Sequence, residues 1–408
     1  MTGAQAAILS RFRALGYRDF RIFFVGAVSS YSGYGILTMA IGWLVFELTS
    51  SEMLLGVVTF SISMPSLFLG FIGGVLADSL NRRWLIFTTE TISMVLVLVL
   101  ATLTALGVVT VWHIIPLALL RGTASAINIP TQNALLPSLV GNKEITNAVV
   151  VYNMIWNSSR ILGPAMGGAL ISIVGAQGSF YAAGLLSLVM AMMILAMRPC
   201  PTPVRQPNFS FLTEITEGLT YIRHNREIMA LIVLAATVSF FGLTYIVLLP
   251  VFAKNILQIG PAGLGMLMTS TGVGALVGSI TIASLGNFGR RGPVMLVCAL
   301  GVAIMLVLFA SSRSVALSIP LLAILGAVNS VYVAITNALL LVLTEEKYRG
   351  RVMSLYNLTW GLLSMGSLPS GAIANVLGAP FAVTLGAVVT GTAVVVVAIL
   401  APSLRKIN

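Results

Sequence analysis

Charged residues are scarce in this chain. Asp, Glu, Lys and Arg make up 8% of its 408 residues, whereas a soluble globular domain carries roughly 25%. Hydrophobic residues make up 58%, and the mean hydropathy is +1.03. This composition excludes an ordinary soluble domain and predicts an integral membrane protein.

Cysteine and histidine are nearly absent as well. Cys200 falls in a predicted loop and Cys298 in a predicted span, so a disulfide framework is not expected. His113 and His224 lack partners at metal-ligand spacing, and no Walker A loop or dinucleotide fingerprint occurs. No nucleophile–base constellation and no added soluble module is visible. We therefore expect no metal, no cofactor and no enzymatic activity.

Long apolar runs dominate the sequence instead. Runs above about 18 residues predict transmembrane helices, and the absence of period-2 alternation argues against an outer-membrane barrel. The first run is too long for the apolar part of a signal peptide. We predict an all-α integral membrane protein with twelve transmembrane helices. The predicted spans are 20–48, 53–77, 84–106, 110–137, 144–173, 177–197, 228–255, 262–286, 292–311, 314–342, 350–376 and 379–402.

Positive charge alternates between the connections. One set carries nearly all the Lys and Arg, and the other holds only Lys254 and Arg313. Short loops rich in Lys and Arg stay in the cytoplasm, so both termini are predicted to be cytoplasmic, in the inner (cytoplasmic) membrane. The net charge of +11 then reports topology and contact with anionic membrane lipids, and no nucleic-acid partner is expected.

The longest connection contains the segment FLTEITEGLTYIRHN. Leu212, Ile215, Leu219 and Ile222 share one helical face there, which predicts an amphipathic helix at the cytoplasmic interface. We interpret it as a linker between two halves rather than as a regulatory element. The predicted parts are an N-terminal six-helix bundle (1–197), the cytoplasmic linker (198–227) and a C-terminal six-helix bundle (228–408).

The two halves resemble each other. The offset that aligns the NALL segment at Asn133 with the one at Asn337 also aligns other identical residues. Two pseudo-symmetric six-helix halves in parallel repetition are typical of a secondary transporter with alternating access, whose site lies between the halves near the midplane. The aligned pairs are Gly70–Gly274, Gly74–Gly278, Gly122–Gly326, Lys143–Lys347, Tyr152–Tyr356, Asn153–Asn357 and Trp156–Trp360.

Several motifs resemble one family. GGVLADSLNRR, Gly73 to Arg83, resembles the signature between helices 2 and 3 of the major facilitator superfamily, and RILGPAMGG, Arg160 to Gly168, resembles its fifth-helix antiporter signature. RDFRIFFVG, NIPTQNALLPSLV, EGLTYIRHN and LLPVFAKNIL resemble the drug-efflux branch that includes macrolide efflux and enterobactin exporter proteins. The resemblance covers nearly the full length. It implies the major facilitator fold and multidrug-type efflux of a small amphiphilic compound (a drug, a siderophore or a lipid-like molecule) by proton-coupled antiport.

The chain departs from this family in places. Asn81 replaces the Gly of the loop signature, where we expect Asn to tolerate a positive φ. Tyr34 stands where many relatives carry an acid in helix 1, and Gln132 where they often carry a basic residue. The second-half loop keeps Arg290 and Arg291 but has lost the Asp. The missing acid leaves a uniporter or a cation-coupled symporter open as an alternative.

Three charged residues fall inside predicted spans, where charges are costly and usually functional. Glu90 lies about 9 Å into the membrane from the cytoplasmic side. It either carries the proton, or pairs structurally with an arginine, or snorkels toward the cytoplasmic mouth. Arg121 is near mid-depth and occupies the place of the Arg in the superfamily's fourth-helix pattern. It either binds a substrate anion or changes the pKa of a nearby carboxyl. The alternative is that carbonyls or amides of neighbouring helices accept all its hydrogen bonds and it has only a structural role. Arg160 either contacts substrate or braces helix 5.

Aromatic and amide side chains complete the expected central cavity, because an exporter of amphiphiles needs stacking and adaptable surfaces. The alternatives are lipid contact, packing and interhelical hydrogen bonds. The candidates are Tyr34, Asn128, Tyr152, Asn153, Trp156, Tyr245, Tyr356, Asn357 and Trp360.

The fifth-helix motif has a mechanical interpretation. Pro164 removes a backbone donor, and Gly163, Gly167 and Gly168 let another backbone come close. A kinked, closely packed helix 5 can then seal one side of the cavity.

The charged turn between helices 2 and 3 is interpreted as a cytoplasmic latch. Gly74 lets helix 2 approach helix 11, and Asp78 faces the positive N-terminal end of that helix and pairs with Arg82 or with a basic residue near 349–351. Arg83 is expected to be free to anchor at headgroups. The default oligomeric state is a monomer.

Overall fold

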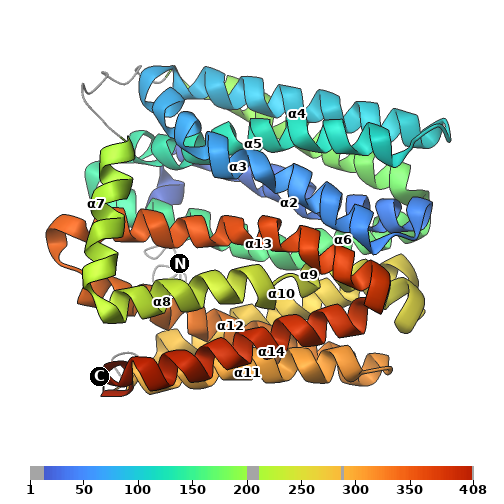
Figure 1. Ribbon diagram of the computed structural model, residues 1–408. Coiled ribbons are helices and arrows are strands. Elements are labelled where there is room, and N and C mark those ends of the chain that lie inside the picture. Colours follow the sequence, from blue (N-terminus) through green and yellow to red (C-terminus); the bar gives the residue numbers. More distant parts are fainter. Residues whose placement is uncertain (1–12, 200–210, 286–288, 407–408) are drawn as a thin grey trace, which may run out of the picture. The chain divides into compact units, whose positions relative to one another are not determined.

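The computed structural model describes residues 13–199, 211–285 and 289–406, which form helices joined by turns (Figure 1). The predicted all-α class is confirmed for this part of the chain. The chain forms two compact units: Met1–Leu44 with Ser61–Pro207, and Val45–Phe60 with Asn208–Asn408. Val45–Phe60 thus groups with the second unit although it lies within the predicted N-terminal bundle. Cys200 lies outside the described residues.

The first unit is built from long helices. Its longest, α6, would extend about 78 Å at 1.5 Å per residue, more than twice the hydrocarbon core of a bilayer. It is interrupted at Gly175, where φ is 76° and ψ is 177°, so the two predicted spans 144–173 and 177–197 meet there without a loop. The helices are α2 (Arg18–Thr49), α3 (Glu52–Ser79), α4 (Arg82–Ala105), α5 (Val111–Leu139) and α6 (Ile145–Ala196).

The second unit contains the remaining helices, of which α10, α11, α12 and α14 lie side by side (Figure 1). The predicted span 228–255 is interrupted by two π-helical segments, Val238–Gly242 and Phe252–Ile256, on either side of α9. The helices are α7 (Phe211–His224), α8 (Arg226–Thr237), α9 (Tyr245–Val251), α10 (Gly260–Leu285), α11 (Arg291–Ser311), α12 (Val315–Leu343), α13 (Arg349–Leu377) and α14 (Ala379–Leu400).

Within the described residues, nine helical stretches are long and apolar enough to cross a membrane. The predicted number of twelve is therefore not strictly reproduced. The merged α6 counts once although it holds two predicted spans, and α5 and α13 are not among the nine. Both of those helices carry many of the polar side chains of the candidate site described below. The chain is nonetheless a multi-pass membrane protein.

Close helix crossings depend on glycine. A Cβ added at Gly122 of α5 would collide with the Ile62 carbonyl of α3, and one at Gly326 of α12 with the Thr271 carbonyl of α10. The repeat-related glycines thus occupy corresponding crossings. Gly73 of α3 similarly packs on the Ala126 carbonyl, whereas a Cβ added at Gly74 meets no described atom within 4 Å.

The amphipathic helix α7 packs within the second unit against the residues that precede and begin α13. The ring of its Tyr221 stacks on Tyr348 with centroids 4.2 Å apart, and its Glu217 lies 2.6 Å from an Arg351 guanidinium nitrogen. The Tyr221 hydroxyl also accepts a hydrogen bond from the Glu345 N–H at 3.2 Å. The helix is therefore fixed to the start of α13 rather than being suspended as a free linker. The side chains of Leu212 and Ile215 lie outside the described part.

Candidate functional site

Glu90 of α4 lies inside the first unit and is only 5% exposed. The Ser30 hydroxyl of α2 donates to its carboxylate at 2.8 Å, and Asn128 and Ser187 also interact with the carboxyl. A carboxylate in a membrane span needs such partners, because hydrocarbon offers none. The snorkelling alternative is wrong, since the side chain is buried among four helices rather than reaching an aqueous end.

A chain of hydrogen bonds runs beside Glu90. Tyr152 donates to Gln132 at 3.1 Å, Gln132 to Asn128 at 2.5 Å, and Asn128 to Thr89 at 2.7 Å. The hydroxyls of Tyr31 and Tyr152 are also hydrogen-bonded, and Tyr31 must be the donor because the proton of Tyr152 is already used. Each of these side chains has a hydrogen-bond partner within the group, as buried polar groups in proteins normally do. We call the group the buried polar cluster; its members are Ser30, Tyr31, Thr89, Glu90, Asn128, Gln132 and Tyr152.

Arg121 of α5 lies near this cluster. Its guanidinium carbon is 5.2 Å from the ring centroid of Tyr34, a cation–π contact. Its Nε is buried and has no hydrogen-bond partner among the described residues. Arg121 and Glu90 attract each other electrostatically, although no ion pair within 4.0 Å joins them in the described part. The arginine therefore keeps a donor available for another group.

Aromatic rings join Arg121 to the cluster. Trp156 of α6 lies edge-on to Tyr31 with centroids 4.9 Å apart, and its centroid is 6.2 Å from that of Tyr34. Phe23 stacks on Tyr152 at 5.9 Å. The structure thus brings together Glu90, Arg121 and four of the predicted cavity residues of the first unit, namely Tyr34, Asn128, Tyr152 and Trp156.

One face of α6 is polar and exposed. Asn153, Asn157 and Arg160 follow each other at helical spacing, and all three are exposed. Charged side chains within spans usually face the bundle interior or a water-filled cavity. The exposed polar face adjoins the buried side of α6 on which Tyr152 lies.

The second-unit candidates divide into two groups. Tyr245 is 3% exposed and packs edge-on against Phe309, with centroids 6.5 Å apart, so it lies in the interior. Tyr356 is equally buried, Asn357 is exposed, and Trp360 is 38% exposed. This order repeats that of Tyr152, Asn153 and Trp156 on α6, which agrees with the internal repeat.

The fifth-helix motif packs against α2. A Cβ added at Gly163 would lie 2.7 Å from the Gly35 Cα, and one at Gly167 would lie 3.2 Å from the Ile36 Cα. Pro164 and Gly168 are buried on the same helix. The two backbones are therefore in direct contact, and Gly35 is a partner that the motif itself did not reveal.

The charged turn between α3 and α4 is held by several bonds. Asp78 lies 3.3 Å from Arg82, whose guanidinium also donates to the Ala77 and Ala134 carbonyls at 3.0 and 2.8 Å. The Asp78 side chain is still 74% exposed. Of the other partners considered for it, Arg351 pairs with Glu217, and Arg349 donates to main-chain carbonyls.

Two expectations for this turn are wrong. Arg83 is not free for headgroups, because it donates to the Ile194 and Leu195 carbonyls at 2.9 and 2.5 Å and so satisfies the end of α6. Asn81 does not adopt a positive φ. Its φ is −65°, and its side chain caps α4 by accepting from the N–H groups of Arg83 and Trp84.

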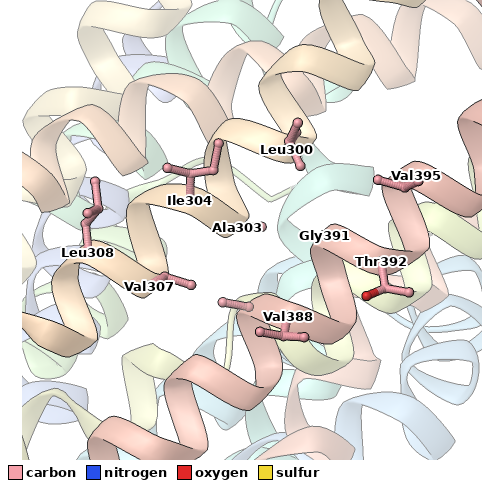
Figure 2. A pocket seen from close by; sticks show the side chains of 10 residues that line it. Leu300, Ala303, Ile304, Val307, Leu308, Val388, Gly391, Thr392 and Val395 are labelled. Atoms are coloured by element: carbon pink, nitrogen blue, oxygen red, sulfur yellow. The ribbon is translucent and has the colours of Figure 1, made fainter.

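An apolar groove lies between α11 and α14 in the second unit (Figure 2). It has a volume of about 460 Å³, and of its ten lining side chains only Thr392 carries a polar atom. Five of the apolar ones are exposed: Leu300, Ile304, Leu308, Val388 and Val395. The groove matches hydrocarbon and offers nothing that would orient a polar solute.

Sequence reasoning missed the small hydroxyl residues in and around the cluster. Ser30, Thr89 and Ser187 carry no charge, and small hydroxyl residues are common in membrane helices. The sequence shows Gln132 only as a departure from the family pattern. Its amide links Tyr152 to Asn128, and a basic residue at this position would have lost the acceptor that Tyr152 uses.

A bundle of apolar helical spans that encloses a buried charged cluster is typical of a membrane transporter. The chain belongs to the transmembrane secretion effector family of the major facilitator superfamily, whose model matches residues 9–408.

Several characterised proteins are similar along nearly their whole length. Macrolide efflux protein A of Streptococcus pyogenes is 25% identical over 400 residues, covering 95% of this chain and 96% of that protein. The staphyloferrin A transporter of Staphylococcus aureus is 24% identical over 362 residues, covering 88% and 90%. Among solved structures, the nucleoside transporter NupG has a TM-score of 0.75 at 14% identity, covering 94% of this chain and 99% of that one. These relatives support export of small compounds, and the structural likeness shows the fold.

Proposed function

We propose that this protein exports a small amphiphilic compound in exchange for protons, by alternating access in the inner membrane. The observation that carries the proposal is Glu90. It is a buried carboxyl inside a membrane unit, held by the Ser30 hydroxyl and attracted by Arg121 without a direct ion pair. Such a group changes its charge when its surroundings change, as alternating access requires.

The surroundings of Glu90 are suited to charge exchange with a solute. Arg121 has a buried Nε without a partner, so it can hold an acceptor group of the solute while it also attracts the carboxylate. A solute whose donor or cationic group binds the Glu90 carboxylate competes there with the proton, so loading a proton displaces the solute and loading the solute displaces the proton. Competition of this kind couples opposite movements of proton and solute.

Each unit offers side chains of the kinds that an amphiphilic solute needs. Arg160, Asn153 and Asn357 offer polar contacts, while Tyr34, Trp156 and Trp360 offer rings that stack on apolar groups. The names of the relatives, a macrolide efflux protein and a staphyloferrin transporter, point to solutes that combine polar and apolar parts. We assign the role of solute contact to these side chains.

The membrane orientation follows from charge. The connections rich in Lys and Arg are assigned to the cytoplasm, and with them both termini. Membrane lipids are then the surroundings of a protein that works as a monomer. Arg82 and Asp78 lie on the cytoplasmic side in this orientation.

Transport by purified protein tests the function directly. The full chain in proteoliposomes, with a pH gradient imposed, is expected to move protons only when a transported compound is present. A panel of a macrolide, a catecholate or carboxylate siderophore and a lysolipid covers the three solute classes, and a pH-sensitive dye inside the vesicles reports the protons. Liposomes without protein are the control, and movement of a compound without protons would contradict antiport.

A uniporter or a cation-coupled symporter is the second candidate. It is favoured by α2, in which Asp19 and Glu47 lie near the ends and no acid lies between them. Counterflow of labelled compound separates the candidates. A uniporter gives the same net flux of the compound with and without a proton gradient. A symporter moves the compound and the coupling cation in the same direction, whereas an antiporter moves them in opposite directions.

The turn at Asp78 is proposed to act as a cytoplasmic latch. Asp78→Asn removes the charge that holds Arg82, so we expect a shift toward inward-facing protein and slower transport, with unchanged affinity for ligand in each state. Accessibility labelling of single engineered cysteines, with Cys200 and Cys298 replaced by Ser, measures the shift. Asp19→Asn, the same change elsewhere in the first unit, is the control. Equal labelling in both variants would rule out the latch.

A further inference from the structure

A small pocket in the second unit contains two unpartnered polar atoms. It lies where the π-helical segment after α8 meets α12 and α13, and it has a volume of about 10 Å³. Among the described residues, Asn329 Oδ1 and the Tyr332 hydroxyl are buried there without a hydrogen-bond partner. Tyr332 is only 2% exposed. Unpaired buried polar groups are uncommon and call for an explanation.

Neighbouring hydroxyl protons are already used. Thr336 donates to the Tyr332 main-chain carbonyl at 2.8 Å, and Thr359 donates to the Tyr356 carbonyl at 2.6 Å. Neither threonine can therefore donate to Asn329 or to Tyr332, although the Thr336 side chain lies within interaction range of the Tyr332 hydroxyl. The two unpartnered atoms are one acceptor, the Asn329 amide oxygen, and one donor, the Tyr332 O–H. Ser239 and Tyr356 line the same pocket.

The internal repeat shows what makes this pocket different. The offset between the halves places Tyr332 at the position of Asn128, Tyr356 at that of Tyr152, and Trp360 at that of Trp156. Ala235 stands at the position of Tyr31. In the first unit, Tyr31 fills the space and ends the hydrogen-bond chain. Ala235 leaves the corresponding space open.

The charged residues have no counterparts in the second unit. The same offset places Val294 at the position of Glu90 and Leu325 at that of Arg121. The pocket is therefore a neutral version of the first unit's cluster, with a donor and an acceptor but no charge. Its volume suits one water-sized group, and the partly exposed Trp360 beside it offers a ring for stacking.

We propose that this pocket is a subsite for a neutral hydroxyl group of the transported compound. A hydroxyl donates to Asn329 Oδ1 and accepts from Tyr332, which satisfies both atoms at once. An ether or a methyl group satisfies at most one of them. The inference rests on the proposed transport function. In it, the first unit compensates the charges of the proton and the solute, and the second unit recognises a neutral hydroxyl group of the solute.

Binding of a hydroxyl probe tests the subsite without any gradient. We use para-fluorophenol and para-fluoroanisole with the full chain in lipid nanodiscs, and fluorine NMR line broadening as the readout. The phenol is expected to bind wild-type protein saturably and Tyr332→Phe roughly tenfold more weakly, since a buried hydrogen bond is worth about one such step. Asn329→Leu should weaken it similarly. The anisole ether can only accept a hydrogen bond, so its binding should be weakened by Tyr332→Phe but not by Asn329→Leu.

The matched control is Tyr181→Phe, which removes a half-exposed hydroxyl that lies 3.4 Å from Thr102 in the first unit. It should bind the phenol as wild type does. Thermal unfolding of each variant checks folding, and Tyr332→Phe should not lower the midpoint because the lost hydroxyl has no partner. Equal binding of the phenol to wild type and Tyr332→Phe, or no saturable binding to wild type, overturns the subsite. Selective binding without proton-coupled transport would leave the subsite standing and remove the antiport proposal.

Discussion

Glu90→Gln is expected to reduce proton-driven transport to the level of empty liposomes while leaving substrate counterflow active. Glutamine has nearly the same volume, and its amide oxygen can still accept the hydrogen bond from Ser30, which is 2.8 Å long in the native protein. What is lost is the exchangeable proton. A protein that cannot load a proton can still exchange one solute molecule for another, because counterflow needs no net proton movement.

The control for this experiment is Glu47→Gln. Glu47 lies on α2 and is exposed, so the substitution removes the same charge without touching the buried polar cluster. Both variants are compared with wild type in the same proteoliposomes, with and without a pH gradient. If Glu90→Gln protein transports at the wild-type rate under the gradient, Glu90 is not the proton carrier. If counterflow is lost as well, its role is in binding or folding.

The charged centre of this site was predictable from the sequence, and its geometry was not. Glu90 and Arg121 stand out because charge is rare in membrane spans, and the structure places them in one unit near Tyr34. Their neutral partners do not stand out. Spans that are apolar on all sides give no periodic contrast, so the side of α2 that faces α4 cannot be read from the sequence. Ser30 could be found only from the structure.

The sequence motifs predicted that certain helices approach each other closely, but not which residues they contact. The glycines of the fifth-helix motif predicted a close approach, and the structure supplies Gly35 as the partner of Gly163. The loop signature predicted a charged turn, but Arg83 satisfies carbonyls at the end of α6 instead of reaching headgroups. That bond joins residues more than a hundred positions apart. Such pairings depend on how helix ends meet in space, which local pattern does not specify.

Gly371→Leu is expected to abolish transport by separating α3 from α13. At this contact, within the second unit, the Ser367 hydroxyl is shared between the Gly56 carbonyl of α3 at 3.0 Å and the Ser364 carbonyl of its own helix at 2.6 Å. A Cβ added at Gly371 would lie 2.6 Å from the Glu52 carbonyl oxygen and 3.2 Å from the Gly56 Cα. Backbone cannot give way cheaply at such distances, so a leucine must push the two helices apart and break the Ser367 bond.

Gly350→Leu is the matched control, because Gly350 lies on the same helix and an added Cβ there meets no described atom within 4 Å. A second measurement follows the contact itself. The hydroxyl of Ser51 lies 3.2 Å from the amide oxygen of Asn375, so cysteines at these two positions should crosslink under mild oxidation, with Cys200 and Cys298 replaced by Ser. Gly371→Leu should prevent the crosslink, and Gly350→Leu should not.

The crosslink also decides what the contact does. Alternating access requires that the solute path open on each side in turn, so a contact that closes one side must break once per cycle. A crosslink between positions 51 and 375 should then stop transport, and a reductant should restore it. Transport that continues at full rate in the crosslinked protein would show that the α3–α13 contact is permanent structure. In that case, loss of transport in Gly371→Leu would report damage to the fold, and its thermal midpoint should be lower than that of Gly350→Leu.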